Sequence, residues 1–138
     1  MHAAFYDRED FDEDISCWDT SKVVTFTEDQ RGMFEEAKSF NQPIGCWDVG
    51  SATTMMYMFY RALDFNQDVS NWNVAKVTDM KYMFVGATSF NQNLSKWDAP
   101  NLAEDGGCGF ANGAPCGPTC GFSGYKADSD EDCDFMML

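Results

Sequence analysis

The chain has 138 residues, and 23 acidic against 9 basic side chains give it a formal net charge of -14. That charge excludes a nucleic-acid-binding protein, which needs a basic face, and disfavours adsorption to anionic membranes. Because 44% of the residues are hydrophobic and 15% are aromatic, the composition also excludes an acidic disordered tail. One folded domain with a packed core is predicted.

No apolar stretch approaches the roughly 20 residues of a membrane span, and the first ten residues lack the basic and apolar regions of a signal peptide. The cysteine count is six, an even number, and favours disulfides over free thiols in a reducing compartment. Disulfides indicate an oxidising compartment: secreted, cell surface or organelle lumen. The candidate cysteines are Cys17, Cys46, Cys108, Cys116, Cys120 and Cys133.

An internal repeat organises the chain. A box that opens with phenylalanine starts at Phe11, Phe40, Phe65 and Phe90, at intervals of 29, 25 and 25 residues. Each box carries a tryptophan seven residues later, at Trp18, Trp47, Trp72 and Trp97. The longer first interval predicts a four-residue insertion around residues 27–30. Residues 1–10 fit half a repeat, so the chain opens in mid-repeat, either as a degenerate cap or as a piece of a longer repeat protein.

Between the tryptophan boxes, apolar residues recur at steps of three and four, as at Val77, Met80, Met83 and Ala87. This spacing predicts a short helix or 3₁₀ turns with one buried face. The segment before each tryptophan, such as 67–72, predicts a brief strand or extended rung. Because a single unit would expose its apolar side, neighbouring units must stack. We therefore expect an α/β solenoid with a short strand and a short helix in each 25-residue rung.

Stacked rungs would place equivalent residues about 4.8 Å apart, in ladders along the axis. The phenylalanines and tryptophans would form two aromatic ladders, and Asn41, Asn66 and Asn91, starting from Asp12, would form an amide ladder. Cys17 and Cys46 occupy the same repeat position. A disulfide between them is feasible, although strain from the parallel pairing could leave both reduced.

The predicted organisation has two parts. Residues 1–102 form the repeat region, with a half repeat over 1–10 and repeats from 11, 40, 65 and 90. Beyond Leu102, Glu104 and Asp105 stand where the helical face should begin, and seven of the eleven glycines lie between Gly106 and Gly124. Residues 103–138 are therefore predicted to form a Gly/Cys-rich cap over the open edge, followed by an acidic tail.

The two boxes, FNQ-x-(I/V/L)-x-x-W-(D/N) and V-x-x-M-x-x-MF-x-x-A, resemble the 25-residue repeats of BspA-like bacterial surface proteins and lipoproteins, which also occur in algal and other protist proteins. The resemblance covers about residues 1–102. It implies a leucine-rich-repeat-like solenoid, suggests surface attachment and protein interaction, and supplies no catalytic residues. The insertion in the first repeat and the cysteine-rich C-terminus depart from the family pattern and favour a eukaryotic setting.

The residues disfavour an enzyme and imply no cofactor. The single histidine, His2, allows neither a Cys–His pair nor a placed Ser–His–Asp set, and nucleotide-binding glycine motifs are missing. The acidic run over residues 128–134 could offer carboxylates to calcium, but it lacks the glycine and glutamate of an EF-hand loop and favours a solvated tail. Cys108, Cys116 and Cys120 could ligate zinc, but their many glycine neighbours favour a disulfide cap.

The sequence therefore predicts a non-enzymatic repeat scaffold that mediates protein–protein interaction, at a surface or as an accessory soluble subunit of a larger, even membrane-associated, assembly. Eleven of the 23 acidic residues lie within 7–36, either as a docking face for a basic protein partner or for solubility alone. The alternative is a module for a glycan or other small ligand, with stacking faces from Tyr57, Tyr60 and Tyr82. An ice-binding array is disfavoured because no second threonine column is present.

Overall fold

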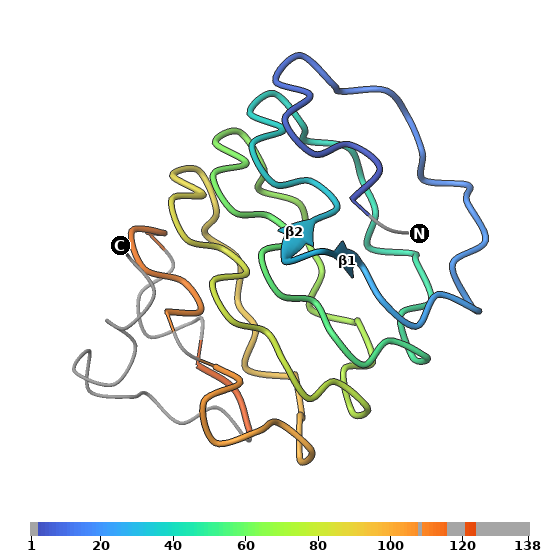
Figure 1. The fold of residues 1–138 in the computed structure, drawn as a ribbon, viewed down its shortest axis with the longest axis vertical. Helices are drawn as coiled ribbons and strands as arrows, with labels where there is room; N and C mark the ends of the chain where they lie inside the picture. Colours follow the sequence, from blue (N-terminus) through green and yellow to red (C-terminus); the bar gives the residue numbers. More distant parts are fainter. Residues whose placement is uncertain (1–2, 108, 116–120, 124–138) are drawn as a thin grey trace.

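The computed structural model describes residues 3–107, 109–115 and 121–123. Over these residues the backbone winds into coils that lie side by side, and Figure 1 shows them following one another from the blue to the orange end of the chain. Neighbouring coils are joined by backbone hydrogen bonds between residues about one repeat apart. The Tyr57 N–H donates to the Lys81 carbonyl at 2.9 Å, for example, and the Thr78 N–H donates to the Thr53 carbonyl at 2.8 Å.

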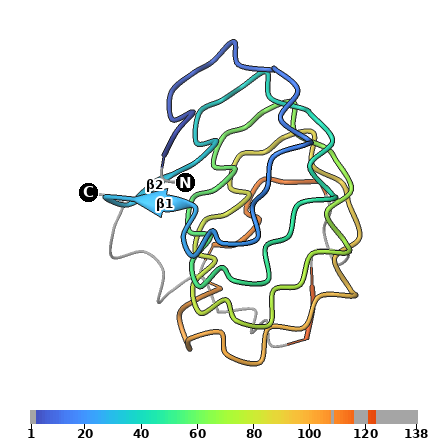
Figure 2. The same ribbon diagram turned by 90° about the vertical axis from the view of Figure 1, so that its right-hand side faces the viewer.

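Strands β1 (Thr27–Glu28) and β2 (Arg31–Gly32) form the two-stranded antiparallel sheet of the described region. The two turn residues between them, Asp29 and Gln30, have left-handed φ values of 49° and 63°. Two left-handed residues in a two-residue loop match the twist of a β-hairpin. The hairpin occupies the residues that lengthen the first repeat interval, and Figure 2 shows it projecting from the side of the stacked coils.

The predicted α/β solenoid, leucine-rich-repeat-like with a short strand and a short helix in each rung, is wrong. The described residues contain no helix, and their only sheet is the β1–β2 pair. The segment 67–72 is not a strand either. Parallel pairing between coils is confined to single-residue bridges, among them Thr25 with Thr54 and Thr54 with Asp79.

Hydrogen bonding along the methionine-rich box explains why no helix forms. The Met58 N–H closes a turn on the Met55 carbonyl three residues earlier, at 3.2 Å, whereas the Tyr57 and Phe59 N–H groups on either side donate to the next coil. An α-helix requires each N–H to bond the carbonyl four residues earlier. Left-handed φ values of 57° at Tyr57 and 53° at Arg61 interrupt the chain further. The box is thus a series of turns that shares its hydrogen bonds with its neighbours.

Phenylalanine rings fill the centre of the coils in two parallel columns. In one column, Phe65 stacks at 5.9 Å on both Phe40 and Phe90, the equivalent residues of the neighbouring coils. In the other, Phe59 stacks on its equivalents at 5.5 and 5.3 Å. The columns meet within each coil, where Phe59 and Phe65 lie 4.0 Å apart. All these rings are fully buried, so they form one continuous core.

The tryptophans occupy equivalent places beside this core and tie each coil to the one before it. The indole N–H of Trp72 donates to the Ile44 carbonyl at 3.2 Å, and that of Trp97 donates to the Val69 carbonyl at 3.0 Å. Trp47, Trp72 and Trp97 are 4%, 4% and 1% exposed. Trp18, in the first coil, is 40% exposed. It lies on the open end of the stack, where no described coil covers it.

An asparagine ladder runs along another edge. The side-chain oxygen of Asp12 accepts the Asn41 N–H at 2.8 Å, that of Asn41 accepts the Asn66 N–H at 2.9 Å, and that of Asn66 accepts the Asn91 N–H at 2.8 Å. Each side chain therefore satisfies a turn N–H of the next coil. Gln67 adds a bond from its amide to the Asn41 carbonyl at 2.7 Å.

The turn pattern continues beyond Leu102. The Gly106 N–H closes a turn on Ala103, and the Phe84 N–H donates to the Phe110 carbonyl at 2.8 Å, as between earlier coils. Gly109 and Gly113 have left-handed φ values of 59° and 82°. Phe110 is buried and packs edge-on against Phe84 at 5.3 Å. The first residues of the predicted cap thus form a further coil. Within the described chain, nothing forms a helix that could cross a lipid bilayer.

Candidate interaction surface

The phenylalanines, tryptophans and asparagines predicted to form ladders lie within the stack, where they pack or form hydrogen bonds between coils. Cys17 and Cys46 are exposed free thiols and form no disulfide with each other. The Cys46 thiol donates a hydrogen bond to the Ser16 carbonyl oxygen at 3.2 Å. The other cysteine candidates, Cys108, Cys116, Cys120 and Cys133, fall outside the described residues, as does the acidic run 128–134. In the part of the chain that is described, no group of three or more His, Cys, Asp or Glu side chains could hold a metal ion.

The β1–β2 hairpin is fixed at its base and exposed beyond it. Gly32 lies so close to the next coil that a Cβ atom there would come within 1.9 Å of the Tyr57 carbonyl oxygen. Only glycine permits this approach. Thr27 is buried, and its carbonyl oxygen accepts the Thr25 hydroxyl at 3.0 Å. Residues 28–31 are all exposed, so a charged turn stands on a rigid base.

Three tyrosines form a cluster that reaches the base of the hairpin through Tyr57. Tyr57 stacks on Tyr82 at 5.2 Å with 16° between the ring planes, and its edge meets Tyr60 at 5.5 Å and 77°. All three are partly exposed. Gly32 stands one repeat before Tyr57, and Gly109 occupies the equivalent position after Tyr82. The tyrosine column is therefore two rings long and ends at a glycine on both sides.

Two half-buried carboxylates accompany these rings. Glu35 accepts the Gly32 N–H at 2.8 Å, and burial raises its pKa despite that bond. Asp79 accepts the Lys81 N–H at 2.9 Å, and burial likewise raises its pKa. Burial also raises the pKa of Tyr57, with further contributions from Tyr82, Glu35 and Asp79. The carboxylates and the tyrosine hydroxyls are therefore close enough to interact electrostatically. We define the hairpin face as residues 27–32, Glu35, Tyr57, Tyr60, Asp79 and Tyr82.

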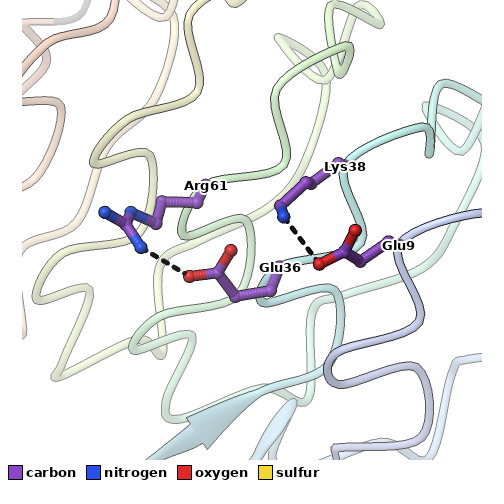
Figure 3. A network of polar contacts seen from close by, with 4 residues as sticks. All are labelled: Glu9, Glu36, Lys38 and Arg61. Carbon is purple, nitrogen blue, oxygen red and sulfur yellow. Dashed lines mark hydrogen bonds and ion pairs between the residues drawn. The ribbon is translucent and has the colours of Figure 1, made fainter.

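Two arginine side chains lie over tyrosine rings, one from the hairpin over Tyr6 of the first coil and one beside Tyr60. The Arg31 guanidinium carbon is 4.7 Å from the ring centroid of Tyr6, and that of Arg61 is 5.7 Å from the centroid of Tyr60. Arg61 also pairs with Glu36 at 2.9 Å, as Figure 3 shows. The guanidinium group thus lies against both an aromatic ring and a carboxylate.

The first coil is rich in acidic side chains. An open hollow is lined there by Asp7, Arg8, Glu9, Asp10, Phe11 and Glu13. Glu9 pairs with Lys38 of the next coil at 2.6 Å (Figure 3). Asp14 and Asp19 hold the N–H groups of the serines two residues later, and hydrogen bonds from those serines lower the pKa of both carboxyls. At neutral pH this coil therefore presents ionised carboxylates to solvent.

Sequence reasoning found part of the hairpin face and missed the rest. It singled out Tyr57, Tyr60 and Tyr82 and the position of the insertion, but it did not bring them together. It counted Glu35 only among the eleven acidic residues of 7–36, and it gave no role to Asp79. The available signal was the 29-residue first interval, because an insertion into a regular stack must project from it as a loop on one face.

One family profile, described as "Mycoplasma protein of unknown function, DUF285", matches residues 1–112. That span covers most of the chain, so the chain belongs to this family. It also includes the coil beyond Leu102. No curated protein and no solved structure matches the chain.

Proposed function

We propose that this member of the DUF285 family is a non-enzymatic repeat scaffold that binds a protein partner through the hairpin face. The observation that carries the proposal is the β1–β2 hairpin. The repeat residues form the core and the hydrogen bonds between coils, whereas the exposed hairpin residues Glu28, Asp29 and Gln30 contribute to neither. Tyrosine and arginine are enriched in protein-binding surfaces, and a charged turn beside them fits the polar rim of such a surface.

The setting of this function follows from the rest of the chain. The resemblance to BspA-like repeats supports attachment at a surface, or an accessory role in a larger assembly. The four cysteines Cys108, Cys116, Cys120 and Cys133, which are predicted to pair, support an oxidising compartment, whereas Cys17 and Cys46 are free thiols. The net charge of -14 supports a basic partner over an acidic one, because opposite charges speed and orient the encounter.

Deletion of residues 27–30 tests the proposal, because it restores the 25-residue interval without touching the core columns. A photo-reactive side chain at position 28 in the intact protein should cross-link to a discrete protein in material from the native source. The same side chain at position 68, an exposed turn of another coil, is the matched control. Excess unlabelled wild-type protein should suppress the cross-link, and excess deletion variant should not. Equal cross-linking from both positions, or equal competition by the deletion variant, would contradict the proposal.

A second candidate function is binding of a glycan or another small neutral ligand. The partial exposure of Tyr57 and Tyr82 favours it, because sugar rings pack on aromatic faces. Titration of wild-type protein with neutral oligosaccharides, followed by the tyrosine ring resonances, distinguishes the two. Saturable shifts with sugars would favour the glycan, and their absence would leave the protein partner.

A further inference from the structure

One tripeptide of the chain, Asn93-Leu94-Ser95, has the Asn-x-Ser pattern of an acceptor for asparagine-linked glycosylation. It is the only Asn-x-Ser or Asn-x-Thr pattern among the 138 residues. A three-residue pattern also occurs by chance, so the position of its side chains decides whether it can be modified. An acceptor asparagine has to lie at the surface, with its amide nitrogen available for reaction.

Asn93 meets both requirements. Asn93 and Ser95 are exposed, whereas Leu94 between them is fully buried in the core. Within the described part of the chain, the Asn93 amide nitrogen donates no hydrogen bond. The side-chain amides of Gln67 and Gln92, in contrast, bond to the asparagine ladder. A group attached to the Asn93 nitrogen would therefore displace no hydrogen bond between these coils.

The same tripeptide is held in a local turn. The side-chain oxygen of Asn93 accepts the Ser95 N–H at 2.9 Å, which places the amide and the hydroxyl-bearing residue on one bend. Because this bond joins residues two apart, it does not depend on the stacking of coils and can form in the unfolded chain. Attachment at the nitrogen leaves the side-chain oxygen as an acceptor, so the turn and the modification are compatible.

Two neighbouring turns of the same kind each contain half of the pattern. Asp68 accepts the Ser70 N–H at 2.9 Å, so that turn has the hydroxyl but a carboxylate in place of the amide. Asn73 accepts the Ala75 N–H at 3.2 Å, so that turn has the amide but no hydroxyl. Asp68 and Asn73 are exposed, like Asn93. The chain thus supplies matched controls for the amide and for the hydroxyl.

We propose that Asn93 carries a covalent glycan, attached by an oligosaccharide transferase from a sugar linked to a polyprenyl diphosphate. A bond forms between Asn93 Nδ2 and the anomeric carbon of the sugar, and the bond from that carbon to the diphosphate oxygen breaks. The diphosphate leaves with the electron pair, and the amide gives up one proton. This modification rests on the oxidising compartment of the proposed function and is independent of the hairpin face.

The protein from its native source provides the first test. Tryptic cleavage after Lys81 and Lys96 releases residues 82–96, which contain Asn91 and Asn93. Asn91 is an internal control, because it is exposed and has no serine or threonine two residues later. An amidase that cleaves the bond between glycan and asparagine, used in heavy-oxygen water, should convert Asn93 into a labelled aspartate. Tandem mass spectrometry should find that label at position 93 and not at position 91.

Expression of the full chain in the secretory pathway of cultured eukaryotic cells tests the two halves of the pattern. The wild-type protein should carry one glycan, seen as a gel shift that the amidase reverses. Asn93→Asp, which keeps the turn oxygen that Asp68 provides in its own turn, should abolish the shift, and so should Ser95→Ala. Asp68→Asn and Ala75→Ser each complete the pattern in a matching turn and should each add a second glycan.

An unmodified 82–96 peptide from the native protein would overturn the inference, as would a glycan that persists in Ser95→Ala. If neither Asp68→Asn nor Ala75→Ser gains a glycan, the role of the turn is wrong. The proposed function fails separately. Native protein with disulfides and an unmodified Asn93 retains the oxidising compartment and rejects the glycan. If position 28 captures no partner while Asn93 is modified, the glycan stands and the scaffold function is wrong.

Discussion

Trp72→Ala should reveal how much of the stability comes from register between coils. Trp72 is 4% exposed, stacks on Trp97 at 6.4 Å and donates its indole N–H to the Ile44 carbonyl at 3.2 Å. Truncating a buried tryptophan leaves a cavity and costs about 3–5 kcal/mol of the free energy of unfolding. A hydrogen bond usually contributes about 0.5–1.5 kcal/mol to stability. The loss of the Trp72 bond should cost the lower end of that range, because the Ile44 carbonyl still accepts the Trp47 N–H.

The chain contains its own control at the same repeat position. Trp18 is 40% exposed and lies at the open end of the stack, so its truncation opens no closed cavity. We expect Trp18→Ala to cost no more than about 2 kcal/mol. A third variant, Trp72→Phe, keeps a ring but removes the indole N–H, and should fall between the two.

Urea unfolding followed by far-ultraviolet circular dichroism measures these differences without relying on tryptophan emission. We expect Trp72→Ala to lose clearly more unfolding free energy than Trp18→Ala, while the slope of that free energy against urea concentration stays similar in the two variants. Equal losses at the two positions would show that burial of the tryptophan between coils does not determine its contribution to the free energy of unfolding. A variant Trp72→Ala as stable as wild type would refute the packed column itself.

Three further outcomes are expected. Non-reducing mass spectrometry should find at least two disulfides among the six cysteines, and six alkylatable thiols would overturn the oxidising compartment. Burial raises the pKa of Asp79 in the folded protein, so its carboxylate opposes folding above that pKa. Asp79→Asn should therefore raise the unfolding temperature at neutral pH, with the gain lost near about pH 3, where Asp79 is protonated both folded and unfolded. Gly45→Ala would put a Cβ 2.3 Å from the Asp68 carbonyl oxygen and should cost about 1–3 kcal/mol in urea unfolding, whereas Gly50→Ala, 3.2 Å from a side-chain oxygen, should cost less.

The spacing of the boxes was enough to predict which residues face one another between coils. A fixed interval places equivalent residues in register whatever backbone joins them, as the Asn41–Asn66–Asn91 hydrogen bonds show. The same spacing could not predict the backbone. Turns that close on the third residue back bury apolar side chains at steps of three and four, as a helix does. The distinguishing signal, a left-handed residue in each turn, was hidden because Tyr57 and Arg61 stand where glycine is expected.

The coil beyond Leu102 was missed for a related reason. Gly109 and Gly113 take the left-handed positions that Tyr82 and Gly86 hold one coil earlier, at a distance of 27 rather than 25 residues. The longer interval and the loss of the methionines removed the pattern, although Phe110 still packs into the core. A search for recurring left-handed turns, in place of recurring apolar side chains, would have found it.

Strain at the tyrosines bears on what the hairpin face is for. A residue other than glycine in the left-handed region costs about 1 kcal/mol or more, and both Tyr57 and Tyr82 carry that cost. Stacking within the pair offsets about 0.5–1.5 kcal/mol of it. Strain alone does not mark a binding site, because Glu36 and Arg61 are also left-handed and are offset by their own ion pair. The tyrosine column has a glycine at the equivalent position on both sides, and the Tyr82 ring lies so close to Gly109 that a Cβ there would come within 2.6 Å of it. Close packing against the next coil therefore accounts for the Tyr82 ring, and cross-linking at position 28 tests the binding role that is proposed for the hairpin face.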